Sequence, residues 1–243
     1  MTDPSSPFAP PPGRGGPQHI PRPEGAVAGR PAPWAALSDE VRGSLTVAAV
    51  GARLAARGPG RRRADGFRPA LHTGESAVLV ALYEDAGAVW VVLTRRSPRL
   101  RSHRWEVAFP GGRCEPGETP WATALREAAE EVALDPAIVE PVGELDRFVT
   151  VGSRSLVHPL VGRLSHRPEL APAPDEVEHI LHVPLAELAA DEVFREELWP
   201  LGDTLRPITF FELAGDTVWG ATAAMLRQLL VVAFALDDEP LTA

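Results

Sequence analysis

The chain has 243 residues, of which 44% are hydrophobic and 23% are charged, proportions that are ordinary for a soluble globular protein. Its net charge of −9 at pH 7 argues against a general nucleic-acid-binding protein, which would normally be basic. No apolar run approaches the roughly 20 residues that cross a bilayer, so no membrane partner is expected. The single cysteine, Cys114, excludes an internal disulfide and fits a cytoplasmic location.

The amino-terminal part of the chain is predicted to lie outside the main domain. Residues 1–33 are rich in proline and glycine with few apolar side chains, so we expect a disordered tail. Apolar residues then recur every three or four positions from Trp34 to about Arg57, which predicts an accessory helix. With its linker this accessory region spans residues 34–67, and the main domain spans residues 68–238.

The main domain has the pattern of strands that flank one long helix. Thr119 and Pro120 have the residue types of a helix N-cap and first turn, and Asp135-Pro136 predicts the end of that helix. Shorter helices are expected over residues 185–190 and 220–234. Strand patterns occur at 76–83, 88–94, 106–109, 142–151, 155–164 and 206–213. This order indicates an α/β protein in which helices flank a mixed sheet.

The long helix carries an unusual cluster of carboxylates. At 100° per residue, Glu127, Glu130 and Glu131 fall within an arc of about 100°. Like charges four residues apart cost about 0.2–0.5 kcal/mol, and the helix dipole opposes negative charge near the C-terminus. A hard divalent cation would relieve both costs, because Mg²⁺ prefers carboxylate oxygens. The alternative is a solvated acidic face, which is the usual meaning of clustered glutamates on a helix.

Several hydrolase classes lack their motifs here. The chain has no G-x4-G-K-[ST] sequence and no G-x-S-x-G sequence, and its seven histidines show no H-E-x-x-H spacing. The sequence therefore argues against a P-loop nucleotidase and a zinc hydrolase of that type.

The acidic helix belongs to a longer pattern that resembles the Nudix hydrolase box. In this sequence the pattern is Gly112-x5-Glu118-x7-Arg126-Glu127-Ala128-x-Glu130-Glu131-x-Ala133-Leu134. The departure is Ala133, where the family usually has glycine; alanine is penalised at positive φ, so the helix end is the feature affected. The resemblance implies a Nudix-type α/β/α sandwich with a mixed sheet, and it assigns residues 68–238 to a Nudix hydrolase domain.

Roles for the carboxylates follow from the helix geometry and from this resemblance. Glu127 and Glu131 lie one turn apart on one face, so we expect them to be the principal ligands of Mg²⁺ or Mn²⁺, with Glu130 as the third. The resemblance implies a further metal ligand, the backbone carbonyl near Gly112. Two of these glutamates, Glu127 and Glu130, are also candidate catalytic residues, as is Arg126.

Two more acidic groups follow from the resemblance. Glu118 is interpreted as the structural ion-pair partner of Arg126. A base or extra ligand is expected from a loop after the helix, where Glu176 is the catalytic candidate, with Glu178 and Asp175 beside it. An ordinary acidic turn is the alternative for this loop, and the identity of the general base stays open.

An arginine-rich run, Thr94 to Arg104, leads into the box and holds five arginines in eleven residues. Arginine binds phosphate through paired hydrogen bonds, so we expect an anion-binding role for Arg96, Arg101, His103 and Arg104. This segment also resembles the signature of the coenzyme A pyrophosphatases. It is Val92-Leu93-Thr94-x-Arg96-Ser97-x3-Arg101-x3-Trp105-x3-Phe109-Pro110-Gly111-Gly112, with Trp105 where that subgroup has glycine.

These patterns predict a metal-dependent hydrolase whose partner is a small nucleotide. The resemblance implies cleavage of coenzyme A or acyl-coenzyme A to 3′,5′-ADP and 4′-phosphopantetheine. The alternatives are the same chemistry on NADH, ADP-ribose or another nucleoside diphosphate derivative, and a Nudix-fold module that senses a nucleotide without cleaving it. The preferred metal, the acyl preference and the oligomeric state, including a homodimer, stay open.

Overall fold

The structure is a computed structural model that describes residues 8–61, 73–150 and 154–237. The predicted boundary between residues 67 and 68 lies outside these residues, and the domain limits stay a prediction. Within the described parts of the chain, no helix is both long and apolar enough to cross a membrane.

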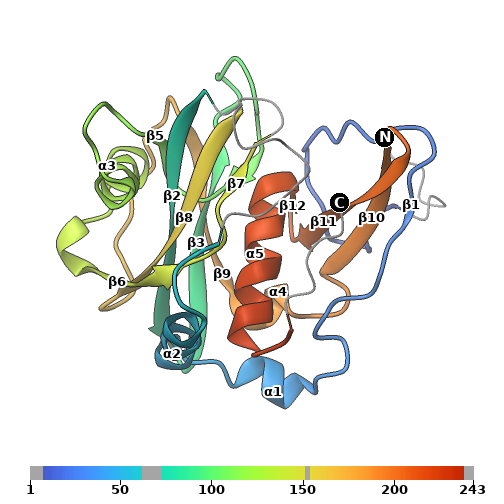
Figure 1. Ribbon diagram of the computed structural model, residues 1–243, viewed down its shortest axis with the longest axis horizontal. Helices are drawn as coiled ribbons and strands as arrows, with labels where there is room; N and C mark the ends of the chain where they lie inside the picture. The colour runs from blue at the N-terminus through green and yellow to red at the C-terminus, as the bar shows by residue number, and fades with distance from the viewer. Residues whose placement is uncertain (1–7, 62–72, 151–153, 238–243) are drawn as a thin grey trace.

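An eight-stranded sheet forms the centre of the molecule (Figure 1). Its strand order is β4-β3-β2-β8-β6, with β5 on β2, β7 on β8 and β9 on β3. Only β2 and β8 pair in parallel, and the other pairs are antiparallel, so the sheet is mixed. The strands are β2 Gly74–Asp85, β3 Ala88–Arg96, β4 Val107–Ala108, β5 Gly111–Arg113, β6 Val139–Glu144, β7 Phe148–Val149, β8 Ser155–Leu164 and β9 Val177–Pro184.

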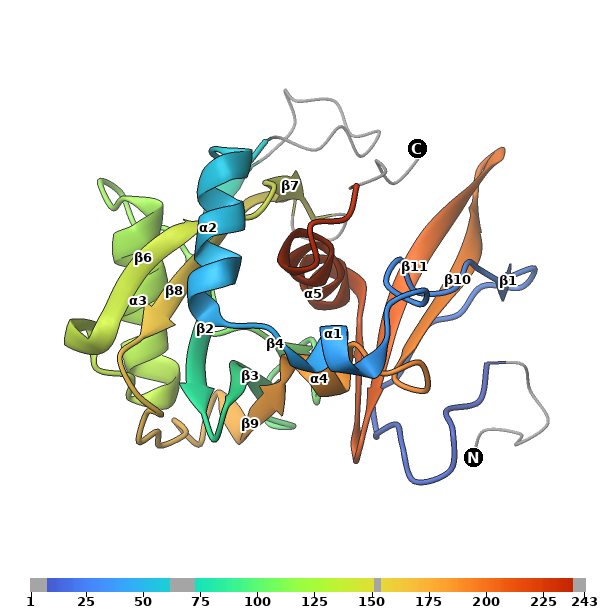
Figure 2. The same cartoon turned by 90° about the horizontal axis from the view of Figure 1, so that it is seen from below.

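Helices cover both faces of this sheet (Figures 1 and 2). Alternate side chains of a strand point to opposite faces, so Ala77 and Leu79 pack with α3 (Pro120–Val132) in one core cluster. Val80 packs with the residues of α5 (Gly220–Ala233) in the other. The remaining helical elements are α1 Asp39–Gly43, α2 Val47–Arg57, α4 Leu185–Leu188 and a 3-10 turn, η2, Pro136–Ile138. The expected α/β/α sandwich with a mixed sheet is confirmed.

A second sheet, which the sequence did not indicate, lies beyond α5 (Figure 2). It is antiparallel with the order β1-β10-β11-β12. Of its strands, only β11 was expected, because β10 does not have an apolar alternation. Glu196 and Glu197 of β10 are buried and bind arginines, among them Arg22 and Arg195. The bounds are β1 Val27–Ala28, β10 Phe194–Leu201, β11 Thr204–Leu213 and β12 Asp216–Trp219.

The expected disorder of residues 1–33 is wrong for residues 8–33; residues 1–7 lie outside the described part. The Gly15 N–H donates to the carbonyl of Leu213 at 2.8 Å, and β1 pairs with β10. Arg22 makes two bonds of 2.7 Å to the buried Glu197 carboxylate. Composition failed as a guide because these contacts are polar, and they do not depend on a large apolar content.

The accessory helix is two helices, α1 (Asp39–Gly43) and α2. The side chain of Thr46 accepts a hydrogen bond from Ala49 N and begins the second helix, as N-cap residues do. Trp34 lies outside both helices, where it is fully buried and donates its Nε1–H to the carbonyl of Ala189 at 2.9 Å. The apolar periodicity therefore identified buried positions correctly but joined three local structures into one helix.

Candidate active site

Helix α3 positions the acidic cluster, and its two ends follow from local sequence. The side chain of Thr119 accepts a hydrogen bond from Ala122 N at 3.2 Å, and Pro120 is the first helical residue. The helix ends at Val132 because Ala133 takes a left-handed conformation, φ 56 and ψ 30. The predicted cap is confirmed, and alanine adopts the backbone geometry for which glycine would be unstrained.

Glu131 is the most deeply buried of the helix carboxylates. Its side chain is 4% exposed, and its Oε2 accepts the N–H of Gly111, at the start of β5, at 3.1 Å. Burial raises the pKa of Glu131 to about 7; the Gly111 N–H and the Arg96 charge lower it, and Glu127 and Glu176 raise it. A carboxylate this basic, held against a backbone turn, is ready to bind a cation or a proton.

Glu127 lies directly against the glycine turn that precedes the helix. A Cβ on Gly112 would be 2.4 Å from the Glu127 carboxyl carbon, so only glycine leaves room for this side chain. Burial raises the pKa of Glu127; the Arg126 guanidinium lowers it, and nearby Glu130 and Glu176 raise it. Glu127 and Glu131 therefore form an electrostatically coupled pair beside β5.

Arg126 contacts three carboxylates, those of Glu118, Glu127 and Glu130. Its Nε and Nη2 donate to Glu118 at 2.8 and 3.1 Å, and the hydrogen bonds from Arg126, Glu115 N and Thr123 lower the pKa of Glu118 to about 2. The predicted ion pair is thus present. The Nη1 of Arg126 also contacts Glu127 at 3.0 Å and Glu130 at 2.9 Å.

The structure does not bring Glu130 into the place expected for a third metal ligand. Its side chain is 60% exposed and bonded to Arg126. Among the described residues, no three acidic, histidine or cysteine side chains are grouped so that they could hold a metal ion as they stand. The carboxylates of Glu127 and Glu131 lie against Gly112 and Gly111, respectively, and their combined negative charge fits a hard divalent cation.

Glu176 is brought to the same site from the loop before β9. It raises the pKa values of both Glu127 and Glu131, so its carboxylate lies within electrostatic range of the pair. Its carbonyl accepts the N–H of Ser97 at 2.8 Å. The neighbouring acids face elsewhere: Glu178 pairs with Arg95, and Asp175 pairs with Arg99.

The arginines of the predicted anion site separate into two groups. Arg96 faces the carboxylates, because its charge lowers the pKa of Glu131, and its buried Nε has no hydrogen-bond partner among the described residues. Arg101 is exposed. His103 pairs with Glu106 at 2.8 Å, and Arg104 donates to the carbonyl of Leu100 at 2.7 Å. In the described part of the chain, these three side chains form no hydrogen bond or ion pair with Glu127, Glu131 or Glu176.

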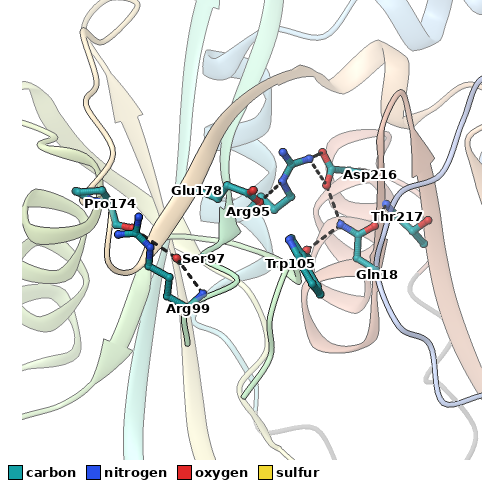
Figure 3. Close-up of polar contacts among 9 residues, drawn as sticks. All are labelled: Gln18, Arg95, Ser97, Arg99, Trp105, Pro174, Glu178, Asp216 and Thr217. Atoms are coloured by element: carbon teal, nitrogen blue, oxygen red, sulfur yellow. Dashed lines mark hydrogen bonds and ion pairs between the residues drawn. The ribbon is translucent and has the colours of Figure 1, made fainter. Parts of the chain in front are cut away.

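Sequence reasoning missed the residues that hold this loop from the other side. Gln18, in the amino-terminal segment, donates to the carbonyl of Trp105 and to the carboxylate of Asp216, which also binds Arg95 (Figure 3). No local motif could have revealed this cluster, because Gln18 and Asp216 are 198 residues apart.

Comparison with known proteins identifies the family. The family model of the NUDIX domain matches residues 74–203, which is more than half of the chain. Nudix hydrolase 22, chloroplastic, from Arabidopsis thaliana is 36% identical over 176 residues, 69% of this chain and 57% of that protein. The peroxisomal coenzyme A diphosphatase NUDT7 of Mus musculus is 39% identical over 128 residues, 52% of this chain and 54% of that protein.

The match thus spans little more than half the length of these relatives. A bacterial relative is covered more fully: an uncharacterized Nudix hydrolase, NudL, of Pectobacterium atrosepticum is 34% identical over 182 residues, 72% of this chain and 88% of that protein. The family model, these relatives and the glutamate helix against a glycine turn agree, and the chain belongs to the Nudix hydrolase family.

Proposed function

We propose that this chain is a metal-dependent pyrophosphohydrolase that cleaves coenzyme A or acyl-coenzyme A to 3′,5′-ADP and (acyl-)4′-phosphopantetheine. The observation that carries the proposal is the buried Glu131 carboxylate, with its pKa raised to about 7, beside Glu127, Glu176 and Arg96. This combination supports a role for Glu127 and Glu131 in binding a metal ion, with Arg96 beside them to bind phosphate.

Nudix hydrolases generally use divalent metal ions, and the donor set here fits one. Glu127 and Glu131, with the carbonyl of Gly112, would hold Mg²⁺ or Mn²⁺. When bound, the ion would neutralise the charge of the diphosphate and lower the pKa of a water molecule. Ionisation of Glu131 at neutral pH would be favoured by the cation, because the raised pKa reflects burial of an unpaired charge.

The remaining groups have roles that follow from their positions. Arg96 would bind the diphosphate, because its guanidinium lies beside Glu131 and its Nε is unpartnered among the described residues. Glu176 would accept a proton from the attacking water, since its exposed carboxylate is near both metal-binding candidates. Arg126 would hold Glu127 in place through its 3.0 Å contact.

The substrate class is supported by the Thr94–Phe109 signature and by the relative named as a coenzyme A diphosphatase. Coenzyme A carries a 3′-phosphate, and the exposed arginine-rich loop offers Arg101 as its partner. Trp105 departs from the signature, which keeps NADH, ADP-ribose and related nucleoside diphosphates as the second candidate. A nucleotide sensor is disfavoured because Glu118, Glu127, Glu130 and Glu131 are all retained.

The test is a substrate panel. The purified chain, with Mg²⁺ or Mn²⁺, is given coenzyme A, acetyl-coenzyme A, NADH and ADP-ribose, and the products are separated by chromatography. We expect 3′,5′-ADP from the first two at a higher kcat/KM than any product from the others. Preferred cleavage of NADH or ADP-ribose would establish the second candidate. Tight binding of one nucleotide with turnover of none would indicate a sensor.

A further inference from the structure

We propose that Gln18 is a positioning residue that holds the arginine-rich loop, residues 97–106, in its substrate-binding shape. The inference rests on the proposed function and deepens it, because it makes the amino-terminal segment part of the substrate site. Gln18 acts through two hydrogen bonds, one to the backbone of Trp105 and one to the carboxylate of Asp216.

Both ends of the Gln18 amide are hydrogen-bonded at this junction (Figure 3). It is 8% exposed, and its Nε2 donates to the carbonyl of Trp105 at 2.8 Å and to Asp216 Oδ1 at 2.7 Å. Its Oε1 accepts the N–H of Thr217 at 2.8 Å. The amide orientation is fixed, because a flipped amide would set N–H against N–H and oxygen against two acceptors.

The first connection fixes a strained part of the loop. Trp105 has φ 58 and His103 has φ 56, left-handed conformations that cost a non-glycine residue on the order of 1–2 kcal/mol. Trp105 N also donates to the carbonyl of Arg96 at 3.1 Å. Gln18 thus binds the carbonyl of the same residue from the side of the second sheet, so both backbone polar groups of Trp105 are held.

The second connection reaches the strand from which Arg96 extends. Asp216 is 2% exposed and accepts from Arg95 Nη1 at 3.1 and 3.3 Å as well as from Gln18. Arg95 also donates to Glu178 at 2.9 Å. Adjacent residues of a strand point to opposite faces, so anchoring Arg95 on this face fixes Arg96 toward Glu131 on the other.

The opposite side of the loop is attached to the segment that carries Glu176. Ser97 N donates to the carbonyl of Glu176 at 2.8 Å, and Arg99 pairs with Asp175 at 3.4 Å. Without Gln18, the loop would keep these contacts and the Trp105 N–H bond to Arg96, but it would lose the bond that holds the Trp105 carbonyl. The expected defect is therefore in substrate binding, since the carboxylates on α3 keep all their recorded partners.

The test compares Gln18→Ala with Arg22→Ala. Arg22 anchors the same segment to Glu197 of β10 and has no recorded contact with the loop, so it controls for general loosening. We expect Gln18→Ala to raise KM for coenzyme A about tenfold, the effect of losing one strong buried hydrogen bond, and to leave kcat within about twofold. Arg22→Ala should keep the wild-type KM.

Trypsin gives a readout that needs no turnover. In Gln18→Ala, cleavage after Arg99, Arg101 and Arg104, mapped by mass spectrometry, should be several-fold faster than in wild type or in Arg22→Ala. Gln18→Met keeps the side-chain bulk without the hydrogen bonds, and serves if the alanine variant does not fold.

The outcomes separate the two proposals. If the wild-type protein cleaves no substrate, the proposed function is wrong. The trypsin comparison would still test whether Gln18 holds the arginine-rich loop. If trypsin cleaves the loop at the wild-type rate in both Gln18 variants, the positioning role of Gln18 is wrong. A lowered kcat with an unchanged KM, or an equal rise in KM in Arg22→Ala, would also contradict that role.

Discussion

Replacing Glu131 by glutamine should separate stability from activity in a pH-dependent way. The substitution keeps the shape of the side chain. It also leaves an oxygen to accept the Gly111 N–H, which in the wild-type structure lies 3.1 Å from Glu131 Oε2. It removes the charge that burial opposes. Since the same charge is the one proposed to hold the metal, the variant should gain stability and lose turnover.

The direction and the size of the stability change follow from the pKa of Glu131. Its ordinary value is 4.5, and the folded value is about 7, so the folded state binds the proton more tightly. The stability that this proton provides is complete below pH 4.5 and is lost as the pH rises through 7. Above pH 8 the ionised side chain costs on the order of 3 kcal/mol, which glutamine avoids.

The assay is thermal unfolding of chelator-treated protein at pH 5 and pH 8.5. We expect Glu131→Gln to match wild type at pH 5 and to unfold about 6–12 °C higher at pH 8.5, from about 2–4 °C per kcal/mol at this chain length. With metal added, turnover should fall at least about 100-fold. Equal unfolding temperatures at pH 8.5 would refute the raised pKa, and full turnover would refute the ligand role.

Three further substitutions test neighbouring contacts. Gly112→Ala places a Cβ 2.4 Å from the Glu127 carboxyl carbon, so kcat/KM should fall at least about tenfold in steady-state kinetics; an active variant would contradict that packing. Ala133→Gly, at φ 56, should raise the free energy of unfolding in urea by about 1 kcal/mol, and a loss of stability would exclude a strained helix end. Arg101→Ala should raise KM for coenzyme A more than for its 3′-dephospho form, whereas equal rises would argue against a 3′-phosphate contact.

Much of the site could be predicted because it is local in sequence. The cap at Thr119 follows from local residue types, and the pair formed by Glu118 and Arg126 was implied by the resemblance of this segment to the Nudix box; both are confirmed. Helix periodicity likewise placed Glu127 and Glu131 on one face. The same periodicity makes Arg126 and Glu130 neighbours four residues apart, but it could not show that one guanidinium would contact Glu118, Glu127 and Glu130 together.

Tertiary structure alone decided how deeply each carboxylate is buried. Glu130 and Glu131 are adjacent in sequence, yet the first is 60% exposed and the second is 4% exposed. That difference arises when α3 packs on the sheet beside β5, and it sets which group has the raised pKa. Spacing specifies the angular position of a side chain, whereas desolvation depends on what covers it.

The amino-terminal segment gives the sharpest contrast. Its proline and glycine content predicted disorder, because the segment offers little apolar surface to bury. The low apolar content is real, but the predicted disorder is wrong for residues 8–33. Its order depends on polar contacts such as those of Gln18 and Arg22, whose partners Asp216 and Glu197 lie 198 and 175 residues away. Such polar contacts become available only after β10, β11 and β12 have formed the sheet that presents them. The sequence by itself therefore determined the Nudix helix and the positions of its carboxylates, and the folded chain decided what surrounds them.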